Sequence, residues 1–237
     1  MLQAELHNKE RRGSLIRDME DVLTSNVFGV LKNIDNYFLG RVLNKVLEVS
    51  FGRDECFTVD FWPTEYKYDT GLGFAAEPDC LISGSDCFIL VEAKYHSGFG
   101  EDSETGLKIK NQLKREYELL LKHSQIKKYS ASKCFLLIVT DDLFNPQEEI
   151  IQQFHPGEVP QNVCWINWEK IGSSLEEALL KYDNRCTVSK IWVEELVKLL
   201  KEKGFRGFRG FRELVDKLQL DGNIVNREFI FYKERIS

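Results

Sequence analysis

The chain has 237 residues, of which 43% are hydrophobic and 30% charged, and its net charge is −6. These values are typical of an ordinary globular protein with a sizeable core. No segment approaches the ~18 apolar residues that a bilayer-spanning helix needs, which argues against a membrane protein. The first ten residues contain no apolar signal core, so we expect a cytoplasmic protein.

The six cysteines occur without a Cys-x-x-Cys pair, and several lie inside apolar runs. This pattern indicates small core residues in a reducing cytosol. A zinc site is disfavoured because the usual metal-ligand spacing is missing.

The first part of the chain predicts two helices and a strand. Apolar residues at helical spacing place one helix over residues 14–35 and another over about 37–49. Glu20 borders the apolar stripe of the first helix, where it is either an ordinary exposed acid or part of a site. Residues 55–62 are a strand candidate that Pro63 ends.

Residues 74–91 have the pattern of a β-hairpin. Two mostly apolar runs, 74–82 and 87–91, flank Ser83-Gly84-Ser85-Asp86, which has turn chemistry. If Gly84 and Ser85 form a two-residue turn, Asp79 lies opposite Leu90.

Three charged residues of this hairpin share one face of the predicted sheet. Because side chains alternate along a strand, Asp79, Glu92 and Lys94 point the same way, and the two acids are diagonal neighbours. Two carboxylates and an ammonium among apolar strands cost free energy unless they are paired. A hard divalent cation that binds both carboxylates would remove that cost.

The second part of the chain alternates helices with strands. Residues 112–122 predict a helix that begins at Gln112 and follows a polar, glycine-rich loop over 96–106. His96 in this loop could contact a phosphate or act as a base, but a loop histidine needs no special role. The apolar run 133–140 predicts a central strand covered on both faces. Further helices are expected at about 146–154, 173–181 and 187–203, and further strands at 163–168 and 226–232.

Basic residues concentrate in two segments of this acidic chain. Residues 108–128 carry seven basic against two acidic residues, and residues 198–212 carry six against one. Either segment is a solvated helix face or part of a track for nucleic-acid phosphates. The glycines of the threefold Gly-Phe-Arg repeat that begins at Gly204 would let the backbone approach a phosphate. The candidate phosphate-binding residues are Lys108, Lys110, Lys114, Arg115, Arg206 and Arg209.

Pro78-Asp79, followed after a turn by Glu92-Ala93-Lys94, resembles the signature of the PD-(D/E)XK nuclease superfamily. The predicted order of a helix, three strands and a helix is similar to the core of the restriction-endonuclease-like fold. The resemblance implies an α/β protein with a mixed sheet flanked by helices. It implies a single domain over 1–237, with the core at about 14–168 and a helical C-terminal extension at about 169–237.

The same resemblance implies roles for individual residues. Asp79 and Glu92 would bind Mg²⁺, with Mn²⁺ as a substitute, and Lys94 would sit beside the attacking water and the scissile phosphate. An acid on the first helix approaches the metal in many members, and Glu20 is the candidate here. RecB-like members carry a Gln and a Tyr on the helix after the hairpin, which makes Gln112 a catalytic candidate. Tyr117 lies one residue further than their usual spacing and is equally explained as a core residue.

The implied function is metal-dependent hydrolysis of phosphodiesters in nucleic acid, with DNA as the expected substrate. The chain would act as a homodimer or as a nuclease module for a partner protein, as in bacterial defence. One alternative is a non-catalytic nucleic-acid or protein-binding module that kept the fold, although the intact Asp79, Glu92 and Lys94 argue against a decayed site. A second alternative is an unrelated α/β protein in which these charged residues form surface ion pairs.

Overall fold

The computed structural model describes residues 20–63, 76–99, 111–127, 129–130, 133–183 and 186–205. By its internal contacts the chain separates into two units, residues 1–205 and residues 206–237. The second unit lies outside the described residues, and so does the strand expected at 226–232. Everything below concerns the first unit.

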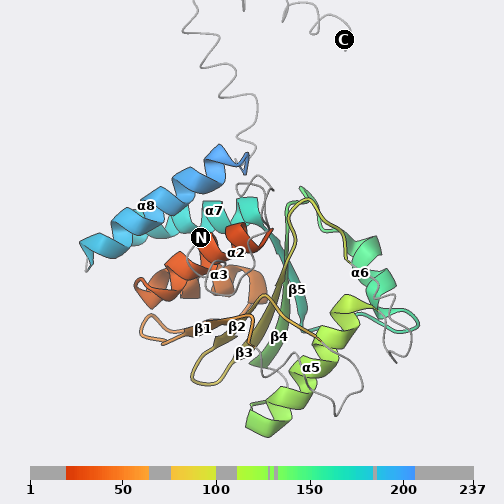
Figure 1. The fold of residues 1–237 in the computed structure, drawn as a ribbon. Helices are drawn as coiled ribbons and strands as arrows, with labels where there is room; N and C mark the ends of the chain where they lie inside the picture. The colour runs from red at the N-terminus through yellow and green to blue at the C-terminus, as the bar shows by residue number, and fades with distance from the viewer. Residues whose placement is uncertain are drawn as a thin grey trace, which may run out of the picture. The chain divides into compact units, whose positions relative to one another are not determined.

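A five-stranded mixed sheet forms the centre of this unit, with the strands in chain order across it (Figure 1). The first three strands are antiparallel neighbours, whereas β3, β4 and β5 run parallel. The carboxyl ends of β3, β4 and β5 therefore lie at the same edge of the sheet. The strands are β1 (Thr58–Phe61), β2 (Cys80–Ser83), β3 (Phe88–Ala93), β4 (Cys134–Thr140) and β5 (Val163–Asn167).

Six helices flank the sheet within the described residues, and they form two groups. Residues of α2, α3, α7 and α8 pack on one face of the sheet in the larger of two apolar clusters, and residues of α5 and α6 pack on the other face. The expected α/β architecture with a mixed sheet between helices is thus confirmed. The helices are α2 (Glu20–Lys32), α3 (Asn36–Leu47), α5 (Gln112–Lys127), α6 (Gln147–Phe154), α7 (Trp168–Lys181) and α8 (Thr187–Glu202).

Strands β3 and β4 lie in the middle of the sheet and are buried along their whole length. Alternate residues of β3 enter different clusters, so that Ile89 and Val91 face the α2 side while Phe88 and Leu90 face the α5 side. Continuous apolar strands with both faces covered are expected at such central positions. This alternation places Glu92, the next even-numbered residue, on the α5 side of the sheet.

The β2–β3 hairpin differs from the prediction in its register. Cys80 pairs with Val91 and Ser83 with Phe88, so residues 84–87 connect the strands and Asp79 is not opposite Leu90. The wider connection is stabilised by Glu55, whose Oε1 accepts hydrogen bonds from the backbone N–H of Ser85 at 2.7 Å and from its hydroxyl at 2.6 Å. Because the register shifts by two residues, the predicted faces of the side chains are unchanged.

Two further expectations can be compared with the structure. Helix α7 begins at Trp168 rather than at about residue 173, because Asn167 caps it by accepting a hydrogen bond from the Lys170 N–H. All six cysteines are free, and Cys80, Cys87 and Cys134 are buried as core residues.

None of the described helices is long and apolar enough to span a membrane.

Candidate active site at the end of strand β3

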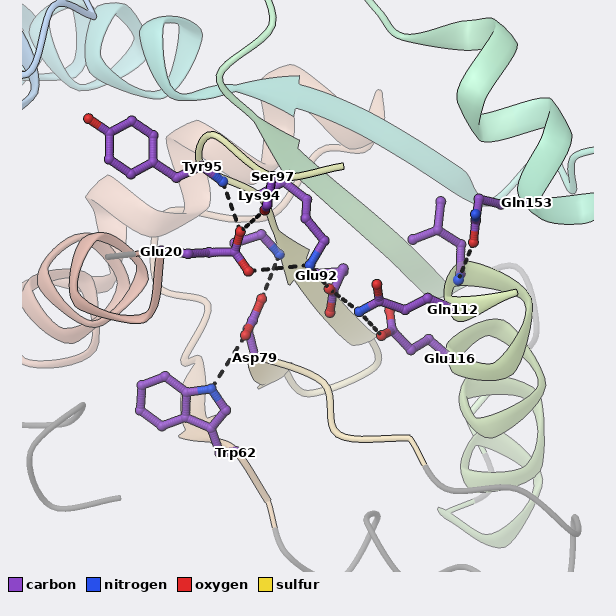
Figure 2. Close-up of polar contacts among 12 residues, drawn as sticks. Glu20, Trp62, Asp79, Glu92, Lys94, Tyr95, Ser97, Gln112, Glu116 and Gln153 are labelled. Carbon is purple, nitrogen blue, oxygen red and sulfur yellow. Dashed lines mark hydrogen bonds and ion pairs between the residues drawn. The ribbon is translucent and has the colours of Figure 1, made fainter. Parts of the chain in front are cut away.

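Asp79 lies immediately before β2 and is hydrogen-bonded to the end of the hairpin (Figure 2). Its Oδ2 accepts a hydrogen bond from the backbone N–H of Ala93 at 2.7 Å, and its Oδ1 accepts one from Trp62 Nε1 at 3.4 Å. The backbone N–H of Trp62 in turn donates to the Asp79 carbonyl at 3.0 Å. These contacts fix the carboxylate beside the residues that end β3.

Glu92 and Lys94 stand two residues apart at the end of β3 and face the same way. The Lys94 ammonium lies 2.5 Å from Glu92 Oε1, and both side chains are buried. The backbone N–H of Lys94 donates to the Val139 carbonyl at 2.7 Å, which continues the pairing with β4. Trp168 Nε1 donates to the Lys94 carbonyl at 3.0 Å, so the backbone on either side of this lysine is fixed.

Helix α5 contributes two polar residues to the same cluster from its first turns. Gln112 Nε2 donates hydrogen bonds to Glu92 Oε1 and, at 3.3 Å, to Glu116 Oε1. Gln112 and Glu116 are four residues apart and therefore lie on the same face of the helix. Both point towards Glu92 (Figure 2).

Glu20, the first residue of α2, reaches the cluster from the other side of the sheet. Its Oε1 lies 3.3 Å from the Lys94 ammonium. Its Oε2 accepts hydrogen bonds from the Tyr95 N–H at 2.9 Å and from the Ser97 hydroxyl. Glu20 thus binds both Lys94 and the first residues of the loop after Lys94.

Four acidic side chains therefore surround one ammonium. Burial raises the pKa of Asp79 and of Glu92, with added repulsion from Glu92 on Asp79 and from Glu116 on Glu92. Burial also raises the pKa of Glu116, to about 7. Burial alone would lower the pKa of Lys94, but Glu92, Glu20 and Asp79 raise it above its ordinary range. The lysine is therefore protonated at neutral pH, and four carboxyl groups lie around its single positive charge.

The excess of acids indicates that a cation or shared protons must balance the cluster. Glu92 Oε2 and Glu116 Oε2 are buried and accept no hydrogen bond from a nitrogen or hydroxyl of the described residues, although the Glu92 and Glu116 carboxyls interact and can share a proton. An unmatched buried carboxylate oxygen is costly, and Asp, Glu and carbonyl oxygens are the ligands that Mg²⁺ takes. The chemical type of these ligands therefore suits a hard divalent cation. Over the described ranges, however, no three His, Cys, Asp or Glu side chains are grouped so as to hold a metal ion, and metal binding stays a prediction for Asp79, Glu92 and Glu20.

Five side chains that the sequence predicted as site residues come together in this one cluster (Figure 2). They are Asp79, Glu92, Lys94, Glu20 and Gln112. Their burial shows that the alternative interpretation as surface ion pairs was wrong, since only 2% of Glu92 is exposed.

Tyr117 and His96 are directed to other partners. The Tyr117 hydroxyl donates to Asn162 Oδ1 at 2.9 Å and its ring packs against Phe154, which identifies it as a core residue. The exposed His96 pairs through Nδ1 with Asp141 Oδ2 at 2.9 Å. This contact links the loop after β3 to the end of β4.

The predicted phosphate track is only partly described. Lys114 is half-buried on α5, whereas Arg115 is 9% exposed, which leaves little of its guanidinium for a phosphate in solution. The remaining four residues of the track, Lys108, Lys110, Arg206 and Arg209, lie outside the described residues.

Sequence reasoning missed Glu116, Trp62 and Ser97. Glu116 is one of the two acids in the basic segment 108–128, and its position four residues after Gln112 is a usable signal. The contacts of Trp62 and Ser97 depend on loops, and no sequence pattern indicates them. The chain matched no protein-family model, no curated protein and no solved structure when compared with each.

Proposed function

We propose that this chain is a metal-dependent nuclease of the PD-(D/E)XK type with a restriction-endonuclease-like core, and that it hydrolyses phosphodiesters in nucleic acid. The observation that carries the proposal is the meeting of Asp79, Glu92 and Lys94 in one buried cluster. The signature from which the sequence resemblance was drawn consists of the same three residues. The antiparallel β1–β2–β3 unit followed by parallel strands is consistent with such a core.

Lys94, Glu20 and Gln112 each have a separate role in the proposed reaction. Lys94 is held protonated by three acids, so it acts by its charge on the phosphate oxygens and not as a general base. Its burial raises the strength of this interaction, because charges act more strongly away from bulk water. Glu20 fixes the backbone at Tyr95, immediately after Lys94, and Gln112 orients Glu92.

Asp79 and Glu92 would hold the metal ion. When bound, Mg²⁺ lowers the pKa of a bound water and stabilises charge on the phosphate. Asp79 is kept in place by the Ala93 N–H, and Glu92 by the Gln112 amide, so both acids present fixed oxygens. Burial raises the pKa of both acids, so they bind protons more tightly than free carboxyls do, and a metal ion would compete with those protons.

A non-catalytic binding module with the same fold remains the second candidate. It predicts nucleic-acid or partner binding without metal-dependent cleavage. The complete set of Asp79, Glu92 and Lys94, with Gln112 and Glu20 bonded to it, favours catalysis. A module that only binds has no need of an ammonium held between buried acids.

The test is a cleavage assay on plasmid, linear duplex and single-stranded substrates with Mg²⁺, Mn²⁺ or EDTA. Cleavage is expected with either metal and not with EDTA. Lys94→Met and Glu92→Gln should abolish it while the protein stays folded, as judged by circular dichroism. The matched control is Lys133→Met, because Lys133 also pairs with an acid of this hairpin, Asp86 at 2.7 Å, but at its opposite end. Equal activity in Lys94→Met and Lys133→Met would contradict the proposal.

A further inference from the structure

We propose that a pocket between β5 and α6 binds an unpaired nucleobase of the substrate, next to the phosphate that the β3 cluster would cleave. This inference rests on the proposed nuclease function and specifies its substrate as nucleic acid with unstacked bases. The pocket has a volume of about 520 Å³, and its described lining comes from α6, β5 and the loops beside them. Trp165 of β5 forms one of its walls.

The register of the sheet places this pocket beside the candidate active site. Glu92 of β3 pairs with Ile138 of β4, and Ile138 pairs with Trp165 of β5. Neighbouring strands lie about 5 Å apart, so the backbones at Glu92 and Trp165 are separated by about 10 Å. Residues in register on parallel strands face the same way, and Ile138 and Trp165 both join the α5–α6 cluster. The pocket therefore opens on the face of the sheet to which Glu92 points.

The chemistry of the lining suits a base better than a phosphate. None of the described lining residues is Lys or Arg, whereas Glu158 is among them, and the nearby Lys170 ammonium lies over the Trp165 ring, 4.8 Å from its centroid. Ile150 and Val159 supply apolar surface, and Trp165 supplies an aromatic ring. Flipped or single-stranded bases are bound by stacking on aromatic or apolar side chains and by hydrogen bonds to their edges.

Two amides at the pocket are placed to make such hydrogen bonds. Asn145 and Gln147 line the pocket and are exposed, and each amide offers both a donor and an acceptor. This combination matches the edge of a base, which also presents donors and acceptors side by side.

The loop that leads into the pocket carries two exposed apolar side chains. Leu143 is 72% and Phe144 is 83% exposed. The loop itself is held in place, since Asn167 Nδ2 donates to the Asp142 carbonyl at 2.9 Å. A loop that is held in place after the end of β4 and presents a phenylalanine to solvent is suited to stacking against the bases of an open strand.

Two labelled oligonucleotides with the same number of phosphates provide the test. One is oligothymidylate, and the other has a stable abasic tetrahydrofuran in place of every nucleoside. Affinity is measured by fluorescence anisotropy in EDTA, and the cleavage rate is measured in Mg²⁺. We expect the wild-type protein to bind the oligothymidylate about tenfold more tightly, from the usual value of stacking one base. It should also cleave this strand faster.

Substitutions in the pocket test whether it is the source of the preference for strands that carry bases. Trp165→Ala should remove most of the preference for bases, and Asn145→Ala/Gln147→Ala, which changes only exposed side chains, should reduce it several-fold. The matched control is Trp192→Ala, because Trp192 is an exposed tryptophan of α8, which packs on the other face of the sheet. Its preference should equal that of the wild type.

The outcomes separate the two proposals. If both strands are bound and cleaved equally, or if only duplex is cleaved, the base pocket is overturned and the nuclease stands. If the Asn145→Ala/Gln147→Ala protein keeps the full preference, the pocket is likewise overturned. If no nucleic acid of any form is bound or cleaved, the proposed function itself fails.

Discussion

The Lys94 ammonium lies 2.5 Å from Glu92 Oε1 and 3.3 Å from Glu20 Oε1, so one cation bridges acids from the sheet and from the first described helix. Asp79 and Glu116 add to the negative charge around it. In a buried cluster the removal of one partner leaves the others without compensation. The stability of this protein and its proposed chemistry therefore depend on the same few side chains.

Loss of the Lys94 cation should destabilise the fold. At pH 8, Lys94→Met is expected to lower the free energy of unfolding by about 3–5 kcal/mol, because buried carboxylates lose their counter-charge. The double variant Lys94→Met/Glu92→Gln should recover part of this loss. Urea unfolding curves of the three proteins provide the measurement. A double variant that is no more stable than Lys94→Met would show that charge is not the cause.

Stability in the absence of metal should fall as the pH rises, and Glu116 provides the clearest case. Its pKa is about 7 in the folded protein against an ordinary 4.5, so the folded state holds a proton that the unfolded state has released between these values. The free energy of unfolding must then decrease as the pH increases from about 4.5 to about 7. The decrease attributable to Glu116 is up to about 3 kcal/mol.

Glu116→Gln tests this dependence directly. The variant should show a flatter decrease in urea-unfolding free energy over pH 4.5–7 in EDTA, since glutamine does not titrate. Glu118→Gln, two residues along α5 and half-exposed, is the matched control and should follow the wild-type curve. Identical slopes for wild type and Glu116→Gln would contradict the assignment.

The sequence predicted the site residues that lie on the strands of the hairpin, but not the one whose burial depends on the packing of a helix. Periodicity and turn residues placed Asp79, Glu92 and Lys94 correctly because alternation along a strand survives a register error of two. The register itself was wrong because Glu55, a residue outside the hairpin, holds the turn. Glu116 was missed because a charged residue on a helix is usually solvated, and only the packing of α5 against β3 shows that this one is buried.

Metal binding should be detectable without any activity assay. At Mg²⁺ concentrations of 10 to 100 times its dissociation constant, the wild-type protein should gain about 1.4–2.7 kcal/mol of stability, because the ion binds the folded state alone. Asp79→Asn and Glu92→Gln should each lose this gain. Asp86→Asn, at the opposite end of the hairpin, serves as the control and should retain it. Thermal melting with Mg²⁺, Mn²⁺ and EDTA measures the shift, and its absence in the wild type would argue against the metal site.

Gln112 should act by the hydrogen bond that it donates to Glu92 and not by filling space. If the proposed nuclease activity is present, Gln112→Ala is expected to lower kcat by about 10- to 100-fold, the usual effect of removing a residue that orients a metal ligand. Gln112→Met separates the two explanations, because it keeps the approximate size of the side chain and removes the donor to Glu92 and Glu116. A donor role predicts that Gln112→Met is about as slow as Gln112→Ala, whereas a packing role predicts near wild-type rates. The comparison of kcat and KM for the two variants decides between them, with thermal melting used to confirm that both proteins are folded.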